Sequence, residues 1–315
     1  MKKVVFYVLL SVFLLSSASA ISEPFKKNMQ ASTDYEPLQR HITGYLAQQP
    51  GVYGLYFVDL ESGQEFGYHS QTIFHAASTF KIPMNLYLYR AAEHGQIELS
   101  EQLLFTETHM EGGTGILKSH TPGGSYSIAQ LADYSILYSD NVATNILLTR
   151  LGKENVKEYM RSLGGQVVDN EQNITCPYDL ALYMQEVIQL AKKPSGEKLL
   201  DNLFDNLLKD RIPAPLPPGI KVANKIGTWP PTNTYNDAAY VVHPDKPYIL
   251  VITSENTPGY SAAREVIRHL SELVYHYQSN GTVPASLKQP GTAHATGVCY
   301  PLLAGGFYAM INFVQ

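Results

Sequence analysis

Segments with the character of β-strands lie near both ends of this chain, and the long stretch between them has the character of helices. The strand segments are rich in β-branched and aromatic residues and are bounded by turn residues. If both ends contribute to one antiparallel sheet, the middle of the chain must be an insertion. The strand segments are residues 52–60 and 64–68, residues 221–229, and two segments around the turn at 243–247.

The helical segments are recognised by apolar residues three and four positions apart and by start and stop residues. Ser127, with Gln130 three residues later, has the pattern of a capping box, which predicts a helix start. Gly95 and Gly152 are predicted C-terminal stops. Helices are expected at residues 36–49, 78–94, 127–137, 142–151, 153–163, 178–192, 197–209 and 261–277.

The predicted fold is therefore α+β. An α/β lobe, with an antiparallel sheet flanked by helices, is expected at about residues 33–77 and 212–278. An all-helical lobe at about residues 78–211 is inserted into it, and both lobes belong to one domain within residues 21–278. Residues 279–315 form a C-terminal tail that fits neither lobe and receives no predicted role.

The first twenty residues have the pattern of an export signal. Lys2 and Lys3 precede an apolar run at residues 4–15 that is short for a membrane span. An Ala-Ser-Ala cleavage site follows and ends at Ala20. We expect the mature protein to be periplasmic, on the cell surface or secreted, with membrane contact only during export. The alternative is an N-terminal membrane anchor.

Composition excludes several function classes. The net charge of −5 and the absence of a basic stripe argue against a nucleic-acid partner. The histidines are scattered and no cysteines have zinc-binding spacing, so no metal site is expected. Cys176 and Cys299 could pair in an oxidising compartment, but their spacing leaves this open. We expect a monomer that acts on a small-molecule substrate.

Ser78 and Lys81 have the spacing of a nucleophile and its base. At a helix start, Lys81 lies one turn after Ser78 on the same face. A serine hydroxyl needs a base, and lysine serves as one only if burial or a neighbouring cation lowers its pKa. The helix N-terminus and the Ser78 N–H would favour developing negative charge. The pair alone is weak evidence, because Ser-x-x-Lys arises by chance in a chain of this length.

Two further segments carry polar groups that fit the same chemistry. In Ser139-Asp140-Asn141, at a break between predicted helices, Ser139 could relay a proton and Asn141 could hold a substrate carbonyl and the Lys81 ammonium. Asp140 is placed to cap the following helix, and capping alone is the alternative explanation of this tripeptide.

The third segment, Lys225-Ile-Gly-Thr, lies on a predicted strand. Lys225 could bind a substrate carboxylate and lower the pKa of Lys81. Gly227 would let the substrate lie along the strand edge as an added strand. The alternative is an ordinary exposed lysine on a strand.

Together and in this order, the three segments resemble class A β-lactamases and penicillin-binding proteins of the serine β-lactamase-like superfamily, which carry S-x-x-K, S-D-N and K-T-G motifs. The resemblance extends to neighbouring residues and covers about residues 33–278, which implies a β-lactamase/transpeptidase-like fold. The similar stretches are STFKIP at 78–83, YSDNVATNILLTRLG at 138–152, and NDAAYVV at 236–242 before a proline-containing turn.

The resemblance also implies roles for individual residues. Ser78 would be acylated, Lys81 would be base or proton relay, and Ser139 would carry the proton to the leaving nitrogen. No cofactor is implied. The substrate-binding residues would be Asn141, Lys225, Gly227 and Thr228, and the backbone N–H groups of Ser78 and Thr228 would form the oxyanion hole.

The chain departs from the family pattern at the third motif. Ile226 stands where the family has threonine, which removes a hydroxyl near the substrate carboxylate, and Thr228 could partly replace it. No arginine is evident on the strands after Lys225 to bind that carboxylate. Arg264, on the last predicted helix, is expected at the surface.

A second departure concerns hydrolysis of the acyl-enzyme. Class A β-lactamases carry an extended loop with an E-x-x-L-N pattern, whose glutamate activates the water. Here the loop is shorter and lacks that pattern. Asp169, with Asn173 four residues later, and Glu171 are candidate bases; the alternative is that both are solvated loop residues.

These observations favour an exported serine hydrolase that forms an acyl-enzyme on Ser78 with β-lactams and hydrolyses their amide bond. One alternative is a D,D-peptidase or penicillin-binding protein acting on cell-wall D-Ala-D-Ala peptides. Another is a sensor that binds β-lactams or peptidoglycan without turnover. An esterase with a G-x-S-x-G elbow is disfavoured, because the nucleophile context is Ala-Ala-Ser-Thr-Phe.

Overall fold

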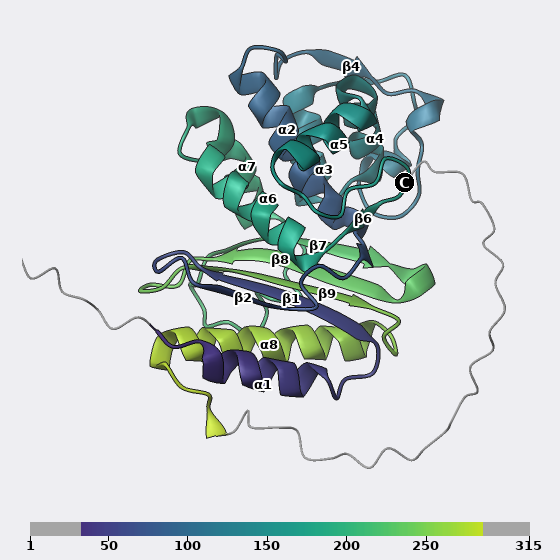
Figure 1. Ribbon diagram of the computed structural model, residues 1–315. Coiled ribbons are helices and arrows are strands. Elements are labelled where there is room, and N and C mark those ends of the chain that lie inside the picture. Colours follow the sequence, from purple (N-terminus) through teal and green to yellow (C-terminus); the bar gives the residue numbers. More distant parts are fainter. Residues whose placement is uncertain (1–32, 286–315) are drawn as a thin grey trace, which may run out of the picture. The chain divides into compact units, whose positions relative to one another are not determined.

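The computed structural model of the protein describes residues 33–285. The predicted export signal, Cys299 and all but the first residues of the predicted tail lie outside this range. At the centre is a five-stranded antiparallel sheet in the order β2-β1-β9-β8-β7 (Figure 1). Its strands are β1 (Val52–Asp59), β2 (Glu65–Tyr68), β7 (Val222–Trp229), β8 (Thr234–Val241) and β9 (Tyr248–Glu255).

The sheet joins the two ends of the described chain. Strands β1 and β9 pair over their whole length, from Val52 opposite Glu255 to Asp59 opposite Tyr248. Strand β7, at the edge of the sheet, pairs with β8 on one side only. The predicted α+β fold with an antiparallel sheet built from both ends is therefore confirmed.

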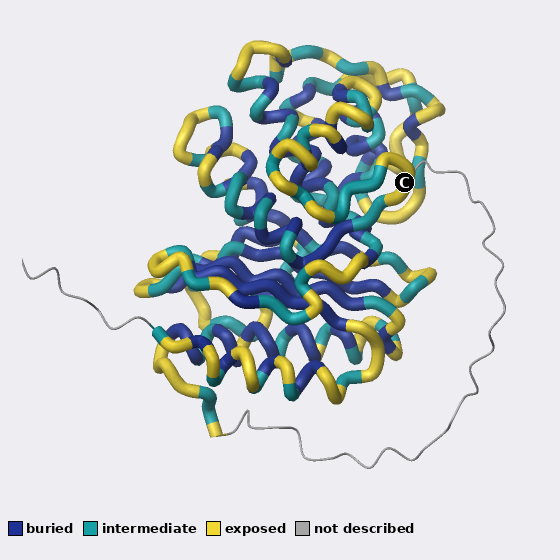
Figure 2. Tube along the Cα trace, in the orientation of Figure 1, coloured by how far each residue is buried: buried dark blue, intermediate teal, exposed yellow. Residues whose placement is uncertain are grey.

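Alternating residues along the central strands face two separate cores. On β9, Leu250 and Ile252 pack with helices α1 (Glu36–Leu46) and α8 (Tyr260–Asn280). Their neighbours Ile249 and Val251 pack with the helices on the opposite face. The strands are consequently buried between two layers of helices (Figure 2). Helix α8 ends at Asn280, so the first residues assigned to a tail belong to this helix.

Six helices fill the stretch between the two groups of strands, as the periodicity predicts. Helix α6 contacts β1 and β9, α7 contacts β7, and α2 contacts α6, α7, α5 and α3. The capping box predicted at Ser127 and Gln130 is present and begins α3. The helices are α2 (Lys81–Glu93), α3 (Ile128–Leu137), α4 (Asn141–Leu151), α5 (Lys153–Ser162), α6 (Pro177–Leu190) and α7 (Pro194–Asp205).

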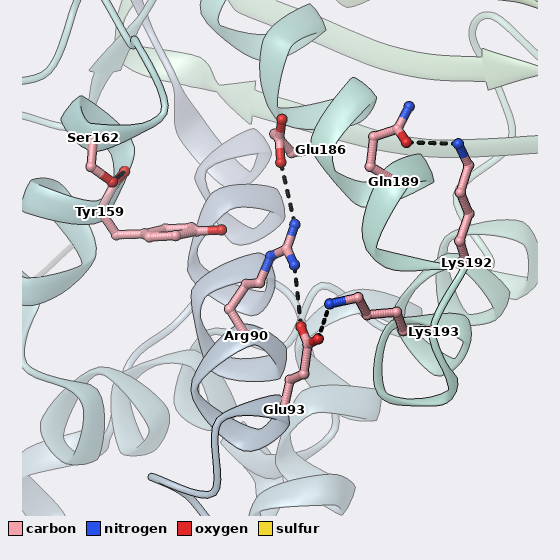
Figure 3. A network of polar contacts seen from close by, with 8 residues as sticks. All are labelled: Arg90, Glu93, Tyr159, Ser162, Glu186, Gln189, Lys192 and Lys193. Atoms are coloured by element: carbon pink, nitrogen blue, oxygen red, sulfur yellow. Dashed lines mark hydrogen bonds and ion pairs between the residues drawn. The ribbon is translucent and has the colours of Figure 1, made fainter. Parts of the chain in front are cut away.

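A network of charged side chains holds the C-terminal end of α2 against its neighbours (Figure 3). Arg90 contacts Glu93 at 3.2 Å and Glu186 on α6 at 3.4 Å, and Lys193 contacts Glu93 as well. Each partly exposed ion pair contributes little by itself. The network lies at the end of α2 remote from Ser78, so it anchors the helix without entering the reaction centre.

Several short elements could not be predicted because two to four residues carry too little pattern. The pair of strands β3 (Phe74–His75) and β6 (Ile174–Thr175) matters most for the site, because it holds the loop after α5 beside the segment before Ser78. In the same place Ala76 N donates to Asn173 O at 2.8 Å. The others are β4 (Gln102–Leu104), β5 (Ser125–Ser127) and the 3₁₀ helices η1 (Ala77–Phe80), η2 (Glu107–His109), η3 (Leu117–Ser119) and η4 (Pro230–Thr232).

Within residues 33–285, no helix combines the length and the apolar character needed to cross a bilayer. Cys176 is buried in this range with a free thiol. No group of histidine, cysteine, aspartate and glutamate side chains in the described range could hold a metal ion.

Candidate active site

Ser78 lies in the short 3₁₀ helix η1, and α2 begins only at Lys81. The helical conformation therefore begins just before Ser78, as the sequence predicts, but its first turn is a 3₁₀ turn and not an α-helical one. Ala77, the first residue of η1, has a φ of 48°, in the left-handed region that a residue with a side chain rarely adopts. His75 Nδ1 accepts a hydrogen bond from Ala77 N at 3.1 Å and holds this turn. Strained backbone of this kind concentrates at functional sites.

The Lys81 amine lies at the centre of the polar cluster. Its Nζ is 3.2 Å from Ser78 Oγ and 3.2 Å from Ser139 Oγ, and it donates to Ser139 O and to Asn141 Oδ1, both at 2.7 Å. A neutral amine has two N–H bonds and one lone pair. The two shortest contacts account for the two donors, which leaves the lone pair for the Ser78 hydroxyl.

Burial makes the neutral form of Lys81 accessible at neutral pH. Its side chain is 4% exposed, and burial lowers its pKa to about 7. The negative charges of Glu111 and Asp140 act in the opposite direction and keep the pKa from falling further. A base whose pKa lies near the working pH is the kind that transfers protons most effectively.

Ser139 connects two lysines. It lies at the break between α3 and α4 with a left-handed φ of 53°, and its hydroxyl is 3.2 Å from Lys81 Nζ and 2.9 Å from Lys225 Nζ. Asp140 caps α4 through Ala143 N at 2.9 Å, which confirms the predicted cap. The same carboxylate accepts the N–H groups of Ile116 and Leu117, so it also fixes the loop over the site.

Lys225 on β7 is buried and only 1% exposed. Burial and the positive charge of Lys81 hold its pKa well below its usual range. The sequence suggested that Lys225 lowers the pKa of Lys81. In the structure, burial is the main cause of the lowered pKa of Lys81. The effect of a neighbouring positive charge is evident instead on the pKa of Lys225.

Gly227 is required for packing, whereas the sequence predicted a role in substrate alignment. A Cβ at this position would lie 2.7 Å from Ala76 O and 3.2 Å from Ala77 Cβ. The glycine therefore lets β7 pack directly against the turn before Ser78. Substrate alignment along the free edge of β7 remains a prediction, and so do the oxyanion roles of the Ser78 and Thr228 N–H groups. Both residues line the pocket.

A pocket of about 600 Å³ opens in front of these groups. Ser78, Lys81, Ser139 and Asn141 line one part of it, and Thr228 lines it from β7. Three segments remote in sequence thus border a single cavity, with apolar, aromatic and charged groups around it. The other lining residues include His75, Phe80, Glu111, Asn145, Leu148, Thr149, Lys153, Lys157, Gln172, Asn173, Ile226 and Trp229.

Comparison with known proteins fits this geometry. The sequence model of the Beta-lactamase enzyme family matches residues 37–278, well over half of the chain. The chain belongs to the β-lactamase enzyme family.

Individual members of the family are distant in sequence. A β-lactamase of Streptomyces cellulosae is 27% identical over 67% of this chain and 74% of its own length, and β-lactamase 3 of Bacillus cereus is 29% identical over 64% and 69%. Among solved structures, PBP-A is 28% identical with a TM-score of 0.72, covering 77% of this chain and 96% of its own. These similarities support β-lactam hydrolysis by a serine hydrolase at the level of the family.

The loop after α5 does not place the two candidate bases in the pocket of this β-lactamase family member. Asp169 Oδ1 accepts the N–H groups of Glu171 and Gln172 at 2.8 and 2.7 Å, so its carboxylate stabilises its own loop. Glu171 is exposed and does not line the pocket. The loop contributes Gln172 and Asn173 instead, and Asn173 Nδ2 donates to Ala77 O at 3.2 Å.

Arg211 is a buried cation that contacts Thr228 on β7 but does not line the pocket. It is 1% exposed and donates to Gly227 O at 2.7 Å, to Asn236 O and to Thr228 Oγ1. It is the first residue of the proline-rich segment RIPAPLPPG at residues 211–219, which precedes β7, and it is therefore not on the strands after Lys225. Arg264 is on α8 as expected, over the ring of Tyr260.

Proposed function

We propose that this protein is an exported serine enzyme that forms an acyl-enzyme through Ser78 with β-lactam amides. The observation that carries the proposal is the contact of Ser78 Oγ with the buried Lys81 amine at 3.2 Å, within a cluster that Ser139 extends to Lys225. Family membership supports the same reaction class. Export is supported by the pattern of residues 1–20.

The proton path follows from the contacts. Neutral Lys81 takes the Ser78 hydroxyl proton as Oγ attacks the lactam carbonyl carbon. The C–N bond breaks, and the departing nitrogen receives the Ser139 hydroxyl proton. A lysine ammonium, 2.9 Å away on Lys225 or 3.2 Å away on Lys81, restores the Ser139 proton. Water then hydrolyses the ester and frees Ser78.

The substrate carboxylate would bind where β7 presents its polar groups. Lys225 donates to Ser139 Oγ from this strand, Thr228 lines the pocket, and Arg211 donates to Thr228 Oγ1. Ile226 adds no hydrogen-bonding group, so Thr228 is the hydroxyl of this segment. Asn141 keeps its Oδ1 on Lys81 and one Nδ2 hydrogen on Gly112 O, which leaves the second Nδ2 hydrogen for a substrate carbonyl.

A second candidate function is a D,D-peptidase or penicillin-binding protein, or a sensor without turnover. The position of Asp169 and Glu171 outside the pocket favours it, because acylation does not need them whereas rapid deacylation needs a base. PBP-A, one of the similar solved structures, was also captured as a point mutant in an acyl-enzyme complex with penicillin-G.

Labelling of the mature protein with a fluorescent penicillin tests the proposal. We expect one covalent adduct per chain, mapped to Ser78 by peptide mass, and no adduct on Ser78→Ala. A Ser78→Ala protein that keeps its label would move the nucleophile elsewhere. Absence of an adduct on the unmodified protein, together with no turnover of a chromogenic cephalosporin, would reject the acyl-enzyme.

A further inference from the structure

The pocket continues past Ser78 along one face of α4. Asn141, Asn145 and Leu148 with Thr149 line it at helical spacing. At 1.5 Å per residue this face runs about 10–12 Å away from the reaction centre. We call this extension the α4 groove. Lys153 and Lys157, at the start of the next helix, line the pocket together with it.

Lys157 is a buried cation that the proposed reaction does not use. Its side chain is 2% exposed, and its Nζ donates to Gln172 O at 3.1 Å and lies 4.9 Å from the centre of the Phe80 ring. Burial lowers its pKa to about 8, so the ammonium form persists at neutral pH. A buried charge is costly unless a counter-charge approaches it.

The surroundings of Lys157 supply more positive charge. Lys153 lies four residues earlier on the same helix face. The positive charges of Lys153 and Arg161 lower the pKa of Lys157 because they disfavour its ammonium form. The negative charge of Asp169 raises the pKa of Lys157, but Asp169 Oδ1 already accepts hydrogen bonds from N–H groups of its own loop. Within residues 33–285, no carboxylate forms an ion pair with Lys157 within 4.0 Å.

The wall contributed by the loop before α3 has the opposite charge. Glu111 lines the pocket, accepts Asn145 Nδ2 at 2.7 Å and acts electrostatically on Lys81. Negative charge is therefore placed near the reaction centre, and positive charge is placed on α5. An extended ligand in this groove meets different charges along its length.

We propose that the α4 groove binds an acyl-donor arm that ends in a carboxylate, held by the Lys157 ammonium with Lys153 beside it. The inference rests on acylation of Ser78 and names the substrate class of the same site. The arm belongs to the acyl half of the substrate, so it stays attached in the acyl-enzyme. It is separate from the substrate carboxylate that Lys225 and Thr228 would bind.

Two penicillins that differ only at the end of the arm provide the test. One is 6-aminopenicillanic acid acylated with adipic acid, which ends in a carboxylate, and the other is acylated with hexanoic acid, which ends in a methyl group. Second-order acylation constants are measured by competition with a fluorescent penicillin. One charge-assisted hydrogen bond gives the adipyl compound an advantage of about tenfold or more. A 6-aminohexanoyl compound, which ends in an ammonium, should be slower than the hexanoyl compound.

Lys157→Met keeps the length of the side chain and removes its charge. We expect the adipyl advantage to fall to about one, while the hexanoyl constant stays within about twofold and shows that the site is folded. Lys153→Met should reduce the advantage partly. Lys192→Met is the matched control, because Lys192 is exposed, contacts Gln189 and does not line the pocket.

Three outcomes would overturn the inference and leave the proposed function standing. The unmodified protein could show no preference for the adipyl compound, or the preference could survive in Lys157→Met. Lys157→Met could also slow both compounds equally, which would place Lys157 in the reaction itself. If neither compound labels Ser78 in the unmodified protein, the proposed function fails and the inference fails with it.

Discussion

The reaction centre and the loop after α5 border the same pocket but use their polar groups differently. In the reaction centre, Lys81 and Lys225 turn their amines toward hydroxyls that can exchange protons. In the loop, Asp169 turns its carboxylate toward its own backbone, and Asn173 contacts the turn before Ser78. The difference separates two chemical steps: the centre is equipped to form an ester, and the loop brings no carboxylate to hydrolyse it.

The largest expected effect comes from Lys81→Met, which removes the base from the reaction centre. We expect the acylation rate constant to fall by about 1000-fold, within the range that general-base catalysis contributes. Stopped-flow labelling with a fluorescent penicillin measures it. A fall of less than tenfold in a folded variant would assign proton removal to another group.

A smaller effect is expected from giving the loop a carboxylate. Asn173→Asp keeps the side-chain shape and places an acid next to the Ala77 carbonyl. We expect the adduct to decay about ten- to a hundredfold faster, with acylation changed by less than about threefold. Intact-mass spectra after removal of free penicillin follow the decay.

Glu171→Gln is the control for that variant, because Glu171 is exposed and outside the pocket. It should leave both acylation and decay unchanged. If Glu171→Gln slowed the decay as strongly as loss of a base would, the loop would supply a base after all. That result would contradict the difference between the reaction centre and the loop.

The pH dependence of acylation tests the role of Lys81 as the base. Acylation needs neutral Lys81, so its rate should rise with pH through the pKa of about 7. The charge of Glu111 raises that pKa, and Glu111→Gln should therefore move the midpoint to lower pH. Glu107→Gln, an exposed change in the same segment outside the pocket, should not move it. A midpoint that moves upward in Glu111→Gln would contradict the assignment.

The smallest effect is on stability. The folded pKa of Lys157, about 8, lies below the ordinary value of 10.5, so burial costs stability most below about pH 8 and progressively less toward pH 10.5. Lys157→Met should raise the free energy of unfolding by about 1–3 kcal/mol at pH 6.5 and by less at pH 10. Urea unfolding at the two pH values measures the difference. Equal destabilisation at both pH values would contradict this account, because the cost of a buried ammonium depends on pH.

The fold could be predicted from the sequence because the patterns that indicate it involve residues close together in the chain. Strand and helix patterns, the capping box at Ser127 and the cap at Asp140 depend on residues a few positions apart, and the structure has them in place. The residue pattern predicted the helix start near Ser78, but it does not distinguish the 3₁₀ first turn from an α-helical one.

Parts of the pocket and of the residues that support it could not be predicted because they depend on packing between remote segments. The three motifs identified Ser78, Ser139 and Lys225, whose residue types and order carry information. Arg211 and Lys157 belong to no recognisable motif. Arg211 is positioned by hydrogen bonds to β7, and Lys157 is positioned by burial against Phe80. Any sequence signal for Arg211 lies in its position as the first residue of the proline-rich segment at residues 211–219.

The most direct test of the central claim is a pre-steady-state measurement on the unmodified protein with a chromogenic cephalosporin. If ester formation is well equipped and ester hydrolysis is not, product should appear in a burst of one equivalent per Ser78, followed by a much slower steady rate. Linear turnover without a burst, and without an adduct in the mass spectrum, would contradict the account.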